Sequence, residues 1–196
     1  MYTFDNDTSV LSKWIRDEVD FPGNIGKGKR NTAARRIQEW LCLHGHHIVV
    51  DSDFGNVTED AVQAFQKSKG FSQSGVVDQK THEALVKPML TVLSHKPKKS
   101  LGFGAMVTNY AKAHLKQHPR EVGGANRGPW VRMYMKGNEG KPWAWCAGFT
   151  TFLMEQTAET KDVAMPIKGS FSCDTLAAQA KNAGLFMRER DRGKHG

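Results

Sequence analysis

Cysteine is scarce in this chain of 196 residues, which contains three: Cys42, Cys146 and Cys173. Three cysteines cannot all pair with one another, and their spacing fits neither a disulfide framework nor a zinc ribbon. We therefore expect free thiols in a reducing compartment, no resident metal and no cofactor. A chemical role for any of the three must come from the residues around it.

Long apolar runs are also missing. No segment approaches the roughly 20 apolar residues that a membrane-spanning helix needs. The first twenty residues include several acidic side chains and lack the basic-then-apolar order of a secretory signal. With 39% hydrophobic and 24% charged residues, the composition is that of a globular protein. We expect a chain that is cytoplasmic as synthesised and is not inserted in a membrane.

Positive charge, by contrast, is abundant. Lys and Arg number 28 against 20 Asp and Glu, which gives a formal net charge of +8. This excess favours an anionic partner, such as nucleic acid, a lipid surface or an anionic cell-wall polymer. The sequence contains neither a basic strand interleaved with aromatic residues nor a recognition-helix pattern, so nucleic acid is not an expected partner.

Apolar residues at helical spacing predict three helices, over residues 31–45, 56–70 and 81–88. Asn31 or Thr32 can cap the first helix, and Pro88 marks the limit of the third. Helices that each carry one apolar face bury it by packing together. This region therefore predicts a compact three-helix module.

The segments that lead into the second and third helices repeat each other. Thr58 matches Thr81 in register and Val62 matches Leu85, so each copy supplies a tight turn, an apolar anchor and a threonine near the helix start. Through residues 51–55, 58, 61–62, 65–66, 75–78, 81 and 85, the chain resembles the peptidoglycan-binding domain 1 family over about residues 31–88. The resemblance implies binding of peptidoglycan, the bacterial cell-wall polymer, in a shallow cleft. Ser52 and Ser74 stand where the family motif has Gly and Asp.

Two short motifs in this half have competing interpretations. The stretch GNIGKGKR, residues 23–30, is superficially like a phosphate loop. It lacks the Gly-Lys-Ser/Thr ending and a preceding strand, which favours a solvated linker. The histidines of His44-Gly45-His46-His47 fit either a metal site or a helix-end turn. The other required ligand positions are missing, which favours the turn.

A basic segment with few apolar residues, 89–101, is typical of a linker. It predicts the following division: an N-terminal helical extension over 1–23, the module over 24–88 and a second domain over 102–196. In the second domain we expect a helix over 103–115, then a glycine-rich loop. Pro129 can start a further helix after that loop.

The segment KPWAWCAGF, residues 141–149, places Cys146 where a long apolar helix is expected to begin. The positive end of the helix dipole and the free N–H groups of the first turn favour the thiolate form of a cysteine at that position. The neighbouring Trp143 and Trp145 would wall the site and restrict water. Cys173 also begins a predicted helix, but it lacks an aromatic wall and is expected to be structural.

This region also resembles a family, through Glu121, Asn126-Arg127-Gly128, Val131, Tyr134, Gly140, Pro142, Trp145-Cys146-Ala147 and Phe149. These residues look like the motif of the papain-like cysteine amidases and peptidases of the CHAP and NlpC/P60 group. The resemblance implies that Cys146 is a nucleophile that attacks an amide carbonyl. It also implies substrate contacts from Glu121, Asn126, Arg127, Trp143 and Trp145.

The same resemblance implies a catalytic histidine on a strand that follows the helix beginning at Cys173. The chain passes that helix and ends in a charged tail, so we expect a sequence that stops before the sheet and its histidine. His195 is the remaining candidate base, because His114 and His118 precede the cysteine, in the wrong order for the family. The expected fold is therefore mainly α, a three-helix module followed by the helical part of a papain-like α+β domain.

Together these patterns predict a peptidoglycan hydrolase that binds the wall through its module and cuts an amide bond of the stem peptide. The alternative is a non-catalytic wall-binding or adaptor protein in which Cys146 packs within its helix. A phage-type lysin and a protein delivered by a secretion system both fit the sequence. The wall bond that is cut and the oligomeric state stay open.

Overall fold

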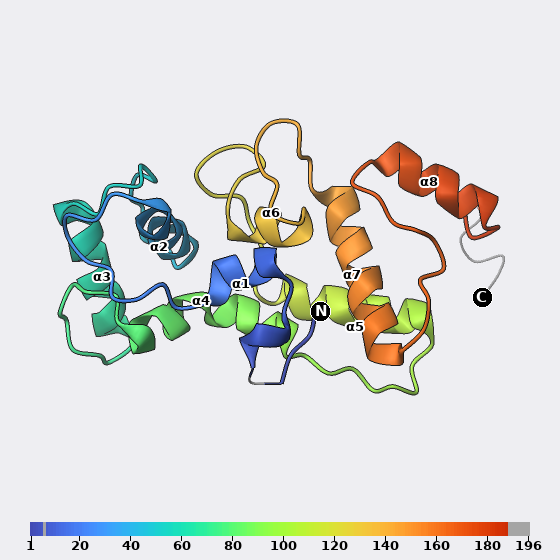
Figure 1. Cartoon of the computed structure of the whole chain (residues 1–196), viewed down its shortest axis with the longest axis horizontal. Helices are drawn as coiled ribbons and strands as arrows, with labels where there is room; N and C mark the ends of the chain where they lie inside the picture. The colour runs from blue at the N-terminus through green and yellow to red at the C-terminus, as the bar shows by residue number, and fades with distance from the viewer. Residues whose placement is uncertain (6, 188–196) are drawn as a thin grey trace.

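The computed structural model describes residues 1–5 and 7–187, and the regular structure of this part is helical (Figure 1). Strand pairing within it is limited to two isolated bridges, Ile25 with Val77 and Arg30 with Asp53. The predicted mainly α fold is confirmed. In chain order the elements are the 3-10 helix η1 (Thr8–Val10) and the helices α1 (Lys13–Val19), α2 (Thr32–Leu43), α3 (Asn56–Ser68), α4 (Gln79–Leu93), α5 (Phe103–Leu115), α6 (Pro129–Tyr134), α7 (Cys146–Lys161) and α8 (Cys173–Asn182).

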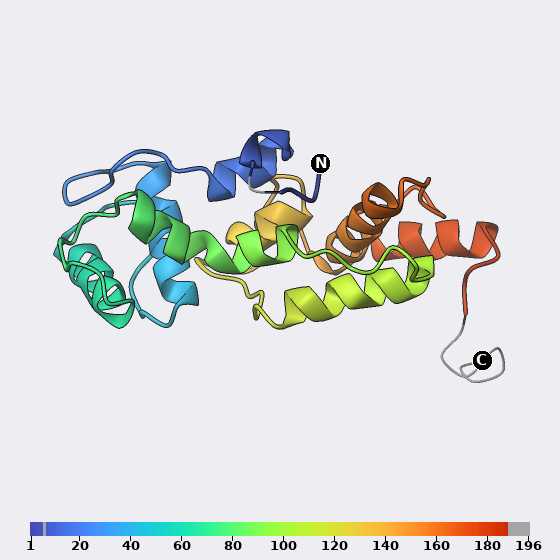
Figure 2. The same cartoon turned by 90° about the horizontal axis from the view of Figure 1, so that it is seen from below.

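The molecule is elongated, with α2 and α3 at one end and α8 at the other (Figures 1 and 2). Helix α4 runs from the first end to the middle, where α1 and α6 lie. Helices α5 and α7 pack against each other beyond that point. Among the described residues, no helix is both long and apolar enough to cross a bilayer.

The three-helix module forms as predicted. Asn31 caps α2, because its side-chain oxygen accepts a hydrogen bond of 2.9 Å from the N–H of Ala34. Gly45 and Gly70 take the left-handed conformation just beyond the ends of α2 and α3. The buried interior of the module includes Ile37, Trp40, Leu41, Phe54, Val62, Phe65, Val77 and Leu85.

The third helix extends beyond its predicted end. Pro88 lies inside α4, which continues to Leu93, so the first residues of the expected linker are helical. Met89, Val92 and Leu93 are fully buried there. The burial of these side chains outweighs the hydrogen bond that a proline within a helix gives up.

The basic stretch of residues 23–30 is mostly exposed, as predicted, but it is fixed to the module. Ile25 is buried and exchanges backbone hydrogen bonds of 3.1 and 2.8 Å with Val77. Farther along, the N–H of Phe54 donates to the carbonyl of Lys29 at 2.9 Å. This stretch is therefore fixed to both of the repeated turns, a long-range pairing that local composition does not reveal.

One hydrophobic core joins the module to the helices beside it. Ile15 of α1, Trp40 of α2, Met89 of α4 and Trp130 of α6 all belong to it. The rings of Trp40 and Trp130 meet edge to face, with centroids 6.1 Å apart. The domain boundaries stay a prediction, but this core extends across two of them.

A buried ionic cluster lies at the centre of the molecule. The guanidinium of Arg132 in α6 binds Glu18 of α1 at 2.7 Å, Glu39 of α2 at 2.5 Å and Glu139 at 2.8 Å. Burial lowers the pKa of Arg132, but the hydrogen bonds and charges of Glu18 and Glu39 outweigh that effect and raise it well above its usual value. Arg132 is therefore a fixed cation that ties together three helices from distant parts of the sequence.

Candidate functional site

The two repeated turns of the module are each held by a buried glutamine. Gln38 donates to the side chains of Asp51 and Thr58 at 2.8 and 3.1 Å and to the carbonyl of Asp53 at 2.9 Å. Its side-chain oxygen accepts from the N–H groups of Asp51 and Ser52. These five bonds occupy both ends of the amide, so the turn before α3 has a defined shape.

Gln66 does the same for the turn before α4. It donates to Ser74, to Thr81 and to the carbonyl of Val76, and it accepts from the N–H of Gly75 at 3.1 Å. Ser74, at the position of Asp51 in the first copy, thus still supplies an acceptor for the glutamine.

The backbone of the two turns also agrees. Ser52 has a φ of 70° and its counterpart Gly75 has a φ of 73°. The turn that contains Ser52 and the turn that contains Ser74 and Gly75 therefore have the same backbone conformation at this position. The signal that could have identified the two glutamines is their place on the buried faces of their helices, where an amide needs partners.

Cys146 is the first residue of α7, as predicted, and its side chain is exposed. The helix start is pressed against α6 at Gly148, where an added Cβ would meet the Met135 sulfur and lie 2.9 Å from the Tyr134 carbonyl oxygen. Close packing on the inner side of this first turn fixes the position of the thiol on the outer side.

Trp145, just before the thiol, is held in place by Glu121. One carboxylate oxygen accepts from the indole Nε1 of Trp145 at 2.9 Å, and the other accepts from the N–H of Asn126 at 2.9 Å. The indole also lies parallel to the Tyr134 ring, with centroids 5.5 Å apart. Glu121 therefore joins the glycine-rich loop to the aromatic wall beside Cys146.

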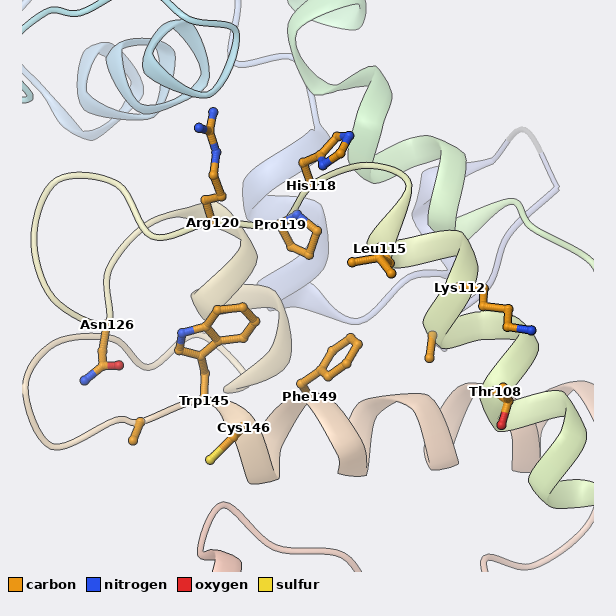
Figure 3. Close-up of a pocket in the computed structure, with 12 residues that line it drawn as sticks. Thr108, Lys112, Leu115, His118, Pro119, Arg120, Asn126, Trp145, Cys146 and Phe149 are labelled. Atoms are coloured by element: carbon orange, nitrogen blue, oxygen red, sulfur yellow. The ribbon is translucent and has the colours of Figure 1, made fainter.

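A pocket of about 790 Å³ lies beside this wall, between α5 and the start of α7. Apolar groups provide most of its surface, and Lys112 and Arg120 add positive charge at its edge. Figure 3 shows Cys146 and His118 at opposite ends of it, with the Trp145 and Phe149 rings between them. The lining residues are Thr108, Ala111, Lys112, Leu115, His118, Pro119, Arg120, Asn126, Ala144, Trp145, Cys146 and Phe149.

The histidines of the described part do not contact the Cys146 thiol. His114 is fully buried and bonded to the Tyr134 hydroxyl at 2.9 Å and to the Gln156 side chain at 3.1 Å. Burial lowers its pKa to about 4, although the Gln156 hydrogen bond raises it, so this imidazole is neutral at physiological pH. His195 lies outside the described residues.

The neighbour of the thiol is a second cysteine. The sulfur atoms of Cys146 and Cys173 are 3.2 Å apart, and both residues are exposed. Cys173 was expected to be structural, but α8, which it begins, contains no buried residue. The path of the loop before α8 brings the two residues together, and neither periodicity nor spacing along the chain could have predicted that path.

Comparison with known proteins identifies one segment. Residues 30–85 match the family model described as "Putative peptidoglycan binding domain". This segment is similar to a peptidoglycan-binding domain. No curated protein matched the chain. No solved structure matched it.

The matched segment covers the Gln38 and Gln66 turns and nearly all of the segment predicted from the repeat. The resemblance of the second half to the CHAP and NlpC/P60 enzymes stays a prediction, since the family match ends at residue 85. Of the predicted site residues, Cys146, Trp145 and Asn126 line one pocket, with Glu121 bonded to the last two.

Two predicted contact residues lie elsewhere. Arg127 and Trp143 are not among the residues that line the pocket. The Trp143 ring instead packs edge to face on Phe171, with centroids 6.0 Å apart. The α5 wall of the pocket was missed by the sequence reasoning. Helical spacing places Leu115 on the apolar face of the predicted helix, whereas the structure leaves it mostly exposed at the pocket.

Proposed function

We propose that the protein is a cell-wall hydrolase that binds peptidoglycan through residues 30–85 and uses Cys146 as a nucleophile on an amide bond of the stem peptide. The match of residues 30–85 to the peptidoglycan-binding family supports the wall as the partner. The observation that carries the chemical part is an exposed thiol at the start of α7, on the edge of a pocket.

In the proposed reaction the Cys146 thiolate attacks the amide carbonyl carbon, and the carbonyl oxygen gains negative charge. The first N–H groups of an α-helix have no partner within the helix. The N–H groups in the first turn of α7 would stabilise this oxyanion. The leaving amine takes a proton, and water then releases the acyl group from the sulfur.

The charges near the pocket suit an acidic substrate. Lys112 and Arg120 lie among its lining residues, and the whole chain has a net charge of +8. An anionic polymer is attracted to such a surface at long range, more strongly at low salt. The apolar surface beside Trp145 and Phe149 would receive the uncharged part of the substrate.

A second candidate function is non-catalytic wall binding. One observation favours it: within the described residues, Cys146 has a thiol beside it and no imidazole. A cysteine nucleophile ordinarily needs a base to take its proton. In this alternative the chain is an adaptor that attaches to the wall and leaves it intact.

The two candidates differ in what happens to purified walls. The test measures co-sedimentation of the whole chain with peptidoglycan and the release of new amino groups from it. The hydrolase proposal expects Cys146→Ala to keep binding and to abolish amine release. Cys42→Ala, at a half-buried thiol within α2, is the matched control and should retain both.

The outcomes separate the candidates. Amine release that continues in Cys146→Ala rules out this nucleophile. Binding without amine release by the unmodified chain supports the adaptor. A chain that stays in solution contradicts both functions.

A further inference from the structure

Two exposed thiols face each other at the starts of two helices. Cys146 is the first residue of α7 and Cys173 the first residue of α8, and their sulfur atoms are 3.2 Å apart. The third cysteine, Cys42, is distant from this pair in the fold, and its thiol donates to the carbonyl of Ile48. The pair is therefore a local dithiol.

Specific contacts hold the loop before α8 against α7. The Thr151 hydroxyl donates to the Ser170 carbonyl at 2.8 Å and accepts from the Ser170 N–H at 3.0 Å. Farther along, the side chain of Gln179 exchanges two hydrogen bonds with the backbone of Gly169. These contacts are independent of the two sulfurs, so the dithiol is preorganised by the fold around it.

A short movement would join the sulfurs. A disulfide has its sulfur atoms about 2.05 Å apart, so they need to approach by roughly 1 Å. Side-chain rotation and a small shift of α8 can supply this, since α8 buries none of its residues. We propose that Cys146 and Cys173 form a thiol–disulfide exchange site that takes small-molecule disulfides, such as oxidised glutathione, and closes to an intramolecular disulfide.

The surroundings give the two thiols different roles. Cys146 borders the pocket, where a small disulfide can enter. The hydrogen bond to the Cys146 sulfur, and its charge, raise the pKa of the Cys173 thiol, while the Ala147 N–H lowers it. Because Cys146 borders the pocket and Cys173 does not line it, Cys146 attacks first and Cys173 is the resolving thiol.

The reaction has two exchange steps. The Cys146 thiolate attacks the disulfide of oxidised glutathione, whose S–S bond breaks and releases one glutathione thiolate. The Cys173 thiolate then attacks the Cys146 sulfur, breaks the mixed disulfide and releases the second glutathione. Two protein thiols are oxidised, one glutathione disulfide is reduced, and the two thiol protons end on the released glutathione molecules.

Metal binding is a weaker interpretation of the same pair. A structural zinc site takes four ligands. No group of three or more His, Cys, Asp or Glu side chains suited to a metal ion occurs over residues 1–5 and 7–187. Two thiols at close distance without further ligands suit sulfur exchange better.

The reduced whole chain, incubated with oxidised glutathione, provides the test. Intact mass and peptide mapping should show the loss of two hydrogen atoms and a cross-link between Cys146 and Cys173. The glutathione adduct should not accumulate, because the second step is intramolecular. Cys42→Ser should behave as the unmodified chain does.

The single variants reveal the intermediate. Cys173→Ser should stop at a stable glutathione adduct on Cys146, and a circular dichroism spectrum like that of the parent shows that it folds. A stable adduct on the unmodified chain, or a cross-link that includes Cys42, would overturn the proposal. The oxidised form also lacks the proposed nucleophile, a consequence that rests on the proposed function; the cross-link itself is measured independently of wall cleavage.

Discussion

Replacement of Arg132 by Met should destabilise the protein by about 3 kcal/mol. Arg132 is almost completely buried and binds Glu18, Glu39 and Glu139, while Met keeps a similar apolar length and removes the charge. Loss of one partner from a buried ion pair costs roughly 3–5 kcal/mol, because the other charge is left uncompensated. The substitution therefore removes the positive charge while the volume of the side chain stays nearly the same.

The lower end of that range follows from the cations that remain. Arg36 still lies 3.2 Å from Glu18, and Arg35 still lies 3.0 Å from Glu39 and 2.5 Å from Glu139. These two arginines are only partly buried, and in the variant they are the remaining cations that pair with the three carboxylates of Glu18, Glu39 and Glu139. One negative charge is left without a partner instead of three.

Urea unfolding at neutral pH measures the free energy of unfolding of both proteins. For a chain of this size, a loss of about 3 kcal/mol corresponds to a melting temperature lower by roughly 6–12 °C. Lys13→Met is the control, since the Lys13–Asp17 pair is exposed and should cost less than about 0.5 kcal/mol. A loss below about 1 kcal/mol in Arg132→Met would refute the reasoning.

Lowering the pH should reduce the difference in the free energy of unfolding between the parent protein and Arg132→Met. Burial raises the pKa of Glu139, but the Gly128 N–H, Arg35 and Arg132 lower it, and the net shift is downward from 4.5. A carboxylate with a lowered pKa stabilises the fold above its unfolded pKa, and this contribution is lost as the pH falls through the folded value. The Arg132→Met variant lacks the part of this stabilisation that Arg132 supplies, so it loses less stability in acid.

Two further predictions concern the packing of α5 and α7. The pKa of buried His114 is lowered from 6.5 to about 4, so the fold loses stability as the pH falls below 6.5, by about 2 kcal/mol at about pH 5. The urea midpoint of His114→Gln should therefore depend less on pH than that of the parent protein. An unchanged pH dependence would contradict this assignment. Gly148→Ala should lower the melting temperature, since overpacking against Tyr134 and Met135 costs about 1–3 kcal/mol and exceeds the helix-propensity gain of up to about 1 kcal/mol. Gly104→Ala in α5, where an added Cβ meets no atom within 4 Å, should raise it, and equal shifts in the two variants would show that crowding is not the cause.

Local patterns in the sequence predicted most of the helices. Helix α5 spans residues 103–115 as expected, α6 starts at Pro129 and α7 starts at Cys146. In each case periodic apolar residues and a start or stop signal lie within a few positions of one another. The extension of α4 past Pro88 was missed because it depends on burial against residues far away in the sequence.

The candidate site was predicted only in part for the same reason. Cys146 and Trp145 are neighbours in the sequence, so their common place at a helix start could be inferred. The approach of Cys173 depends on a loop held by Thr151, and the Arg132 cluster depends on three helices that meet only in the folded chain. Contacts of this kind carry no periodic signal.

The core shared by α1, α4 and α6 limits which positions the Cys146 thiol can contact. A thiol on a flexible tether would search a volume around its anchoring point, and linker length would set the radius of that volume. Here continuous packing connects residues 30–85 to the centre of the molecule, and α5 and α7 pack beyond that centre. Cys146 is thus held at a fixed distance and direction from residues 30–85. Under the proposed function, the protein would cleave those bonds whose distance and direction from the wall strand bound to residues 30–85 match the position of Cys146.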